Sequence, residues 1–223
     1  VLPSSLTSIE SEAFANCNKL YEIYNLSSLP LVKGSWEYGQ VALKAKIIHT
    51  SLDEDPLSII KTQEDIDLIQ IGDEYLAVKY RGSNTELTLG ELHYDGVKVS
   101  DYSIEKDFLN DSSVSSLTVG TQAQLTPESF ANCYNLTYVD LKDSMAFEIP
   151  DSCFNSCSSL TTVLLPTYMN RIGSYAFSSC SSLQSIDLPA GASIGAYAFA
   201  YCHNLERVVL NEGVSFDYSN NYA

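Results

Sequence analysis

Six cysteines and three histidines are the residues of this 223-residue chain best suited to nucleophilic or metal chemistry. Cys202 and His203 are adjacent, and a thiol beside an imidazole can act as an activated nucleophile. A zinc site needs cysteine and histidine ligands at close spacing, but the chain has no Cys-x-x-Cys motif and its histidines are scattered. The sequence therefore predicts no metal ion and no cofactor, and the role of the Cys202–His203 pair depends on its surroundings.

Those surroundings are one copy of a repeat with the pattern Phe-x-x-Cys-x-x-Leu-x-x-[Ile/Val]-x-Leu. Four clear copies, spaced by 24, 23 and 22 residues, begin at Phe130, Phe154, Phe177 and Phe199. Two degenerate copies begin at Phe14, with Asn25 at the final Leu position, and at Phe108, with Asp111 at the Cys position. Five landmarks kept through four copies indicate a repeat protein.

A unit of about 23 residues cannot bury its apolar side alone, so such units stack and share one elongated core. The segment 160–165 alternates in polarity at its end and is followed by Pro166, which cannot continue a strand. We expect one short parallel strand per coil, with a short strand or helical turn on the opposite side. The fold class predicted is a leucine-rich-repeat-like solenoid, β-rich, with each Phe inside the coil.

The segment Ile194-Gly195-Ala196-Tyr197-Ala198-Phe199 and the motif after it resemble the BspA-like leucine-rich repeats of bacterial and some protozoan surface proteins. The resemblance covers residues 1–26 and roughly 101–214. It implies a secreted or surface-displayed protein that binds host or matrix macromolecules or other cells, and it supplies no catalytic residues. The first residues, Val1 to Ser5, contain no export leader, so the predicted location rests on the resemblance.

The distance from Phe14 to Phe108 leaves room for an insertion between the first two copies. We predict domains at 1–26 (first repeat unit), 27–100 (β-rich insertion) and 101–223 (further repeats and the C-terminal end). Gly72-Asp73 and the Tyr94–Val97 segment are flanked by alternating residues, which is typical of β-hairpins. The segment 41–48 is predicted as a strand or short helix.

The repeat also bears on the cysteines. Five of them occupy one repeat position, and Cys153 takes the small-residue position before Phe154. We expect a column of buried, reduced thiols, and disulfides between adjacent coils remain the alternative. Cys202 then belongs to the column, while His203 occupies a variable turn, so we predict that the chain is not an enzyme.

Twelve basic against 28 acidic residues give a formal charge of −16, which repels nucleic acid and anionic lipid. No apolar run approaches the roughly 18 residues of a spanning helix, so we expect no nucleic-acid partner and no direct membrane insertion. The acidic run at 53–55 lacks the ligand spacing of a calcium loop and is interpreted as a solvated face.

In a solenoid strand the landmark residues point inward, and the residues between them form a ribbon on one face. From this ribbon we predict ligand-binding residues at Tyr21, Glu22, Tyr24, Tyr138, Asp140, Leu164, Gln184, Asp187, Glu206 and Arg207. Tyrosine gives a large contact area at a small entropic cost, which favours an extracellular protein or glycan as partner. Two other hypotheses remain: a structural spacer within a larger surface protein, and a hydrolase whose site in the insertion uses His49 or His93.

Overall fold

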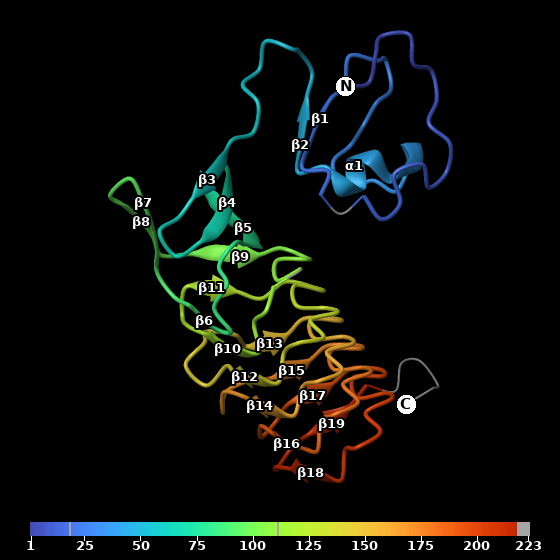
Figure 1. Ribbon diagram of the computed structural model, residues 1–223. Coiled ribbons are helices and arrows are strands. Elements are labelled where there is room, and N and C mark those ends of the chain that lie inside the picture. Colours follow the sequence, from blue (N-terminus) through green and yellow to red (C-terminus); the bar gives the residue numbers. More distant parts are fainter. Residues whose placement is uncertain (18, 111, 218–223) are drawn as a thin grey trace. The chain divides into compact units, whose positions relative to one another are not determined.

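A computed structural model describes residues 1–17, 19–110 and 112–217 (Figure 1). The chain divides into two compact units, Val1–Ile59 with Gln70–Asp73, and Ile60–Ile69 with Glu74–Ala223. Asp111, the substituted cysteine position of the second degenerate copy, lies outside the described residues.

The first unit contains two parallel strands and a short helical segment. Its elements are β1 (Glu22–Tyr24), the 3-10 turn η1 (Tyr38–Gln40), α1 (Val41–Lys44) and β2 (Ile47–His49). β1 pairs with β2 in parallel, and Leu2 bridges to Asn25. Leu2, Ile23, Val41 and Ala45 form a small core. The segment 41–48, predicted as strand or helix, contains both.

The second unit is a solenoid whose coils each contribute a strand to a parallel ladder. Four strands lie side by side in the order β14 (Thr162–Leu164), β12 (Tyr138–Asp140), β10 (Ser116–Val119) and β6 (Glu86–Leu89). A separate parallel pair follows, formed by β16 (Ser185–Leu188) and β18 (Arg207–Leu210). The predicted parallel strand in each coil is confirmed.

A second ladder runs along the opposite side of the coils. It joins β13 (Glu148–Ile149), β15 (Arg171–Ile172), β17 (Ser193–Ile194) and β19 (Ser215–Phe216), all in parallel. β13, β15 and β17 lie before Phe154, Phe177 and Phe199, as predicted, and β19 follows the last repeat Phe. Tight turns then surround the Phe, and the backbone N–H of Phe154, for example, donates to the carbonyl oxygen of Ala176 in the next coil.

The remaining strands form one five-stranded sheet and one hairpin. The sheet order is β11 (Ala123–Gln124), β9 (Tyr102–Ile104), β5 (Glu74–Tyr80), β4 (Ile66–Ile71) and β3 (Ile59–Lys61). The Gly72-Asp73 turn joins β4 to β5, and β7 (Leu92–Tyr94) pairs antiparallel with β8 (Val97–Val99). Both hairpins predicted from the sequence are present.

The parallel ladders extend into the segment predicted as an insertion. β2 pairs with β1, and β6 pairs with β10 through the register Leu87↔Leu117. Solenoid-type pairing is therefore present on both sides of residues 59–80. The domain boundaries at 26/27 and 100/101 stay a prediction.

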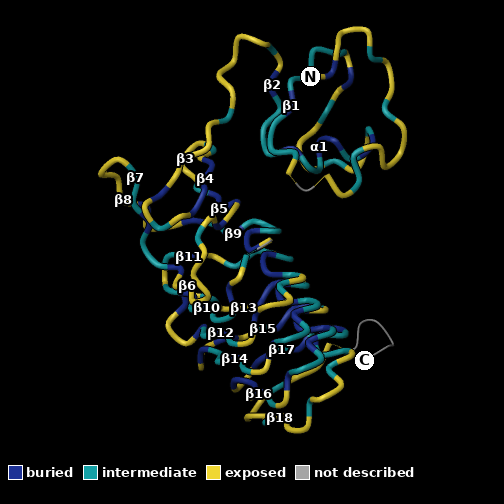
Figure 2. Tube along the Cα trace, viewed as in Figure 1, coloured by how far each residue is buried: buried dark blue, intermediate teal, exposed yellow. Residues whose placement is uncertain are grey.

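The core of the solenoid is a column of stacked phenylalanine rings, as the sequence predicted. Ring centroids are 5.4 Å apart between Phe130 and Phe154, 5.4 Å between Phe154 and Phe177, and 5.5 Å between Phe177 and Phe199. Successive planes differ by only 12°, 4° and 4°. The buried parts of the chain follow this interior from coil to coil (Figure 2).

A column of cysteines runs beside the rings, and all the cysteines are free. Each thiol along most of this column donates to the carbonyl oxygen of the phenylalanine one coil earlier. The pairs are Cys157 with Phe130, Cys180 with Phe154, and Cys202 with Phe177. Burial raises the pKa of the Cys180 thiol to about 12, which keeps this donor protonated at neutral pH.

One part of the cysteine prediction is wrong. Cys17 is exposed, and Cys133 and Cys202 are only partly buried, whereas Cys153, Cys157 and Cys180 are buried. Cys17 belongs to the first unit, whose small core does not cover it. Repeat position alone therefore does not ensure burial, because a neighbouring coil must also cover the thiol.

Gly173 and Gly195 allow the coils to approach closely on the side of the second ladder. A Cβ at Gly173 would lie 2.6 Å from the backbone nitrogen of Asp151, and one at Gly195 would lie 2.6 Å from that of Ser174. Real Cβ atoms do not approach backbone so closely. The Ile-Gly element of the repeat is thus explained by contact between coils.

Candidate functional site

The outward-pointing residues of the parallel ladder form two straight rows, which we call the strand face. The register places Ser116, Tyr138 and Thr162 side by side in one row, and Thr118, Asp140 and Leu164 in the other. Parallel strands lie about 4.8 Å apart, so neighbours in a row can contact the same ligand. Val139 and Val163, between the rows, point into the core and are buried.

Most of the predicted ligand-binding residues lie on this face or at its edge. Tyr138, Asp140 and Leu164 are half-buried, and the Tyr138 hydroxyl donates to Asp140 Oδ2 at 3.3 Å. Gln184 and Glu206 directly precede β16 and β18, and they are exposed together with Asp187 and Arg207. Tyr21, Glu22 and Tyr24 lie at β1 in the first unit, so they form a separate group.

Sequence reasoning missed the contribution of β6 to the strand face. Glu86 lies beside Ser116, and Thr88 beside Thr118, so both extend the two rows by one strand. No Phe-x-x-Cys motif precedes β6, and the pairing spans 30 residues. The alternation of Thr85 to Leu89 indicated a strand but could not show which strand it pairs with.

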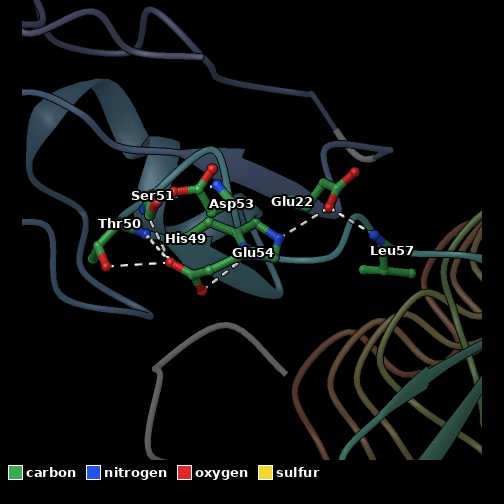
Figure 3. Close-up of polar contacts among 7 residues, drawn as sticks. All are labelled: Glu22, His49, Thr50, Ser51, Asp53, Glu54 and Leu57. Carbon is green, nitrogen blue, oxygen red and sulfur yellow. Dashed lines mark hydrogen bonds and ion pairs between the residues drawn. The ribbon is translucent and has the colours of Figure 1, made fainter.

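His49 lies between two carboxylates in the first unit (Figure 3). Its Nε2 is 3.0 Å from Glu22 Oε2, and its Nδ1 is 3.2 Å from Glu54 Oε2. Its ring stacks on Tyr24, with centroids 4.3 Å apart. Glu22 Oε2 also accepts the backbone N–H of Leu57 at 2.9 Å. Glu22 and Tyr24, predicted to bind a ligand, therefore also hold this cluster together.

Glu54 closes the same cluster. Its Oε1 accepts the backbone N–H groups of Thr50 and Ser51 at 2.7 and 3.0 Å (Figure 3). These bonds, together with the contact to His49, lower the pKa of the Glu54 carboxyl. The acidic run at 53–55 is thus partly a structural cap for the 50–57 loop.

His93 has a similar environment in the second unit. Its Nδ1 is 2.8 Å from Glu64 Oε1, and its Nε2 is 3.0 Å from Glu91 Oε1. Lys98 forms an ion pair with the same Glu91. A histidine acting as a general base for a hydroxyl or thiol nucleophile directs one ring nitrogen at that nucleophile. Both nitrogens of His49 and of His93 are instead directed at carboxylates.

The Cys202–His203 pair does not have the geometry of an activated thiol. The Cys202 thiol donates to the carbonyl oxygen of Phe177 at 3.1 Å, and burial raises its pKa. A cysteine nucleophile needs the opposite, a lowered pKa. His203 is exposed and lies near the Tyr201 ring, with centroids 6.3 Å apart. The pair is better explained by the repeat.

Two other classes of site are absent from the part of the chain that the structure describes. Within residues 1–17, 19–110 and 112–217, no three histidine, cysteine or acidic side chains are grouped so that they could hold a metal ion. No helix in the described parts of the chain is long and apolar enough to cross a membrane.

The stacked coils, the two parallel ladders and the internal Phe column define a leucine-rich-repeat solenoid. The sequence matches the BspA type leucine rich repeat region, in six copies, over residues 1–55 and 102–223. The chain belongs to this family. No curated protein is significantly similar to it.

Three solved structures illustrate the likeness. A T. pallidum leucine rich repeat protein is 22% identical, with a TM-score of 0.51, over 74% of this chain and 86% of that one. A leucine rich cell surface protein from Faecalibacterium prausnitzii A2-165 is 18% identical, with a TM-score of 0.34, over 71% of this chain and 55% of that one. A Bacteroides ovatus leucine-rich repeat protein is 20% identical, with a TM-score of 0.33, over 76% of this chain and 56% of that one. The T. pallidum structure supports the fold.

Proposed function

We propose that this chain is a non-catalytic binding module of a secreted or cell-surface protein. It recognises an extracellular protein or glycan through the strand face. The observation that carries the proposal is the register of β6, β10, β12 and β14, which aligns polar and aromatic side chains in two rows over a rigid core. A preformed surface of this kind loses little conformational entropy on binding.

Three features support binding over catalysis. The repeat family of the chain is typically non-catalytic. Both ring nitrogens of His49 and of His93 face carboxylates, and the pKa of the Cys202 thiol is raised. The charge of −16 disfavours nucleic acid and anionic lipid as partners.

The test is binding of the full chain to arrayed glycans and extracellular matrix proteins. The variant Tyr138→Ala removes the largest side chain of the β12 segment of the strand face, and Tyr21→Ala and Tyr24→Ala alter the β1 group. Tyr134→Ala is the matched control, because Tyr134 is 58% exposed and lies in a turn outside the strand face.

We expect binding that Tyr138→Ala weakens by about tenfold, equivalent to roughly 1.4 kcal/mol, and that Tyr134→Ala leaves unchanged. Equal loss in both variants would place recognition elsewhere. No binding at all would favour a structural spacer. Turnover in a hydrolase screen that His93→Ala abolishes would favour an enzyme with its site at residues 27–100.

A further inference from the structure

The parallel ladder of the solenoid is interrupted between β14 and β16. Among residues 112–217, β14 forms ladder hydrogen bonds only with β12, and β16 only with β18. Other neighbouring strands on this side, from β6 to β14, are bonded without a break. We call the interface between these two strands the β14–β16 seam.

The direction of the backbone groups at the seam follows from the bonds on either side. Leu141 N–H donates to Leu164 O at 2.9 Å, and Thr162 N–H donates to Thr137 O at 3.2 Å, so Thr162 and Leu164 face β12. Successive residues of a strand direct their backbone N–H and C=O groups to opposite sides. The N–H and C=O of Val163 therefore face the seam.

The same reasoning applies to the other side of the seam. Glu206 N–H and Arg207 N–H both donate to Gln184 O, so Gln184 faces β18. The backbone groups of Ser185 and Asp187 therefore face β14 across the seam. These donors and acceptors need partners, since an unpaired backbone group costs free energy when it is removed from water.

A hollow of about 280 Å³ lies over the seam. Its lining includes Val163 and Ile186 and the hydroxyl residues Thr161, Thr162 and Ser185. This volume is close to the lower end of the range of small-molecule sites, about 300–1,000 Å³, so it suits a group the size of one sugar ring.

Two basic side chains also line the hollow of this acidic protein. Lys142 and Arg207 line it together with a single acid, Asp187. Arg207 Nη2 is 3.8 Å from Asp187 Oδ1, which is too long for a hydrogen bond, so this contact leaves the guanidinium donors available. Lys142 Nζ is 3.3 Å from Asp140 Oδ2, at the outer edge of the strand face.

We propose that the hollow over the β14–β16 seam binds a carboxylate-bearing sugar ring, such as a uronic acid unit of a glycan. Vicinal hydroxyls are donors and acceptors at once and match the seam backbone and the threonine and serine hydroxyls. The carboxylate pairs with Arg207 and Lys142. The inference rests on the proposed binding function and assigns a ligand class to one part of the strand face.

An extended peptide strand is a poorer fit to the seam. Cα atoms of β14 and β16 approach within 8 Å of each other. A strand inserted between them would need about twice the strand spacing, roughly 9.6 Å. A ring lying over the seam needs no such separation.

The experiment measures binding of oligogalacturonides to the full chain by calorimetry, with neutral galacto-oligosaccharides and a polyglutamate peptide as comparison probes. Ser185→Trp fills the hollow from its wall. Ser100→Trp is the matched control, because Ser100 is exposed in the loop between β8 and β9, outside the strand face and the hollow. Arg207→Gln removes a cation at the hollow, and Lys33→Gln removes an exposed one elsewhere.

We expect the oligogalacturonide to bind, and Ser185→Trp and Arg207→Gln each to weaken binding by at least about tenfold. Ser100→Trp and Lys33→Gln should bind as the parent does, and all variants should retain the parent thermal transition. Equal binding of neutral sugars or of polyglutamate, no binding, or no effect of Ser185→Trp would each overturn the inference. If Tyr138→Ala still abolishes another interaction found on the arrays, the proposed function stands while the ligand assignment fails.

Discussion

The Cys180 thiol lies 3.2 Å from the carbonyl oxygen of Phe154, one coil earlier, and donates a hydrogen bond to it. The same carbonyl accepts the backbone N–H of Cys157 at 3.3 Å. The Phe154 carbonyl oxygen thus joins the backbone of Cys157 in its own coil to the thiol of Cys180 in the next coil. It explains why a small, weakly polar side chain suits this position.

Replacing Cys180 by alanine should therefore lower the free energy of unfolding. The buried site loses a weak hydrogen bond and gains a small cavity, which together cost about 1–2 kcal/mol. Urea unfolding with an unchanged m-value is the measurement. Cys17→Ala is the control and should stay within about 0.5 kcal/mol, because Cys17 is exposed.

Phe154→Ala should be far more destabilising. The ring is fully buried and stacks on Phe130 and Phe177, with centroids 5.4 Å away on both sides. Loss of a buried phenylalanine costs about 3–5 kcal/mol. Coils depend on their neighbours, so amide exchange should accelerate from Phe130 to Phe177. Phe147→Ala removes a ring that is 57% exposed, and a comparable effect there would contradict the assigned column.

Replacement by alanine should destabilise the protein at Gly173 but not at Gly90. At Gly173 a Cβ would lie 2.6 Å from Asp151 N and 2.8 Å from Pro150 C, so the coils must separate and Gly173→Ala should cost about 2 kcal/mol or more. At Gly90 nothing lies within 4 Å of the added carbon. Gly90→Ala should leave stability unchanged or raise it by about 0.4–1 kcal/mol. Thermal unfolding of both variants provides the comparison, and equal effects would be inconsistent with close coil contact.

The spacing of Phe, Cys and Leu was sufficient to predict the solenoid, because each landmark fills the same place in successive coils. The turns at Gly72 and Gly96 were equally readable, since both glycines have positive φ. The turns around each Phe could not be predicted from the sequence. Glu128, Ser152, Tyr175 and Tyr197 all have φ near +60°, although none is glycine. The backbone N–H groups of Glu128, Ser152 and Tyr175 donate to carbonyl oxygens of the next coil, an interaction that no local preference encodes.

The polar clusters were harder still to predict. Glu22 and His49 are 27 residues apart, and His93 meets Glu64 across 29 residues. Only the parallel pairing of β1 with β2, which sets Tyr24 beside His49, brings the first pair together. Side-chain chemistry identified these residues as unusual, but strand register determines their partners.

Glu22→Ala should loosen the loop 50–57. Glu22 accepts hydrogen bonds from both His49 and the Leu57 N–H. Its removal leaves these two donors with water as their only acceptor. The side chain is 28% exposed, which limits the expected loss to on the order of 1 kcal/mol. Hydrogen exchange at Leu57 should accelerate, whereas Glu10→Ala, at an exposed position, should not change it. Unchanged exchange in Glu22→Ala would mean that Glu54 alone holds the loop.

The β7–β8 hairpin should become less tightly held as the pH rises through the folded-state pKa of His93. The hydrogen bond to Glu64 raises the pKa of His93, against the opposing effect of burial, and the charges of Glu64 and Glu91 raise it further. A pKa raised above 6.5 means that protonated His93 stabilises the fold fully below that pH, and this contribution is lost as the pH rises through the folded-state pKa. The His93 ring resonances in an NMR titration should show a midpoint above 6.5, and His93→Gln should remove the pH dependence of hairpin amide exchange over the same interval. A midpoint at or below 6.5 would show that the two carboxylates do not bind the charged ring.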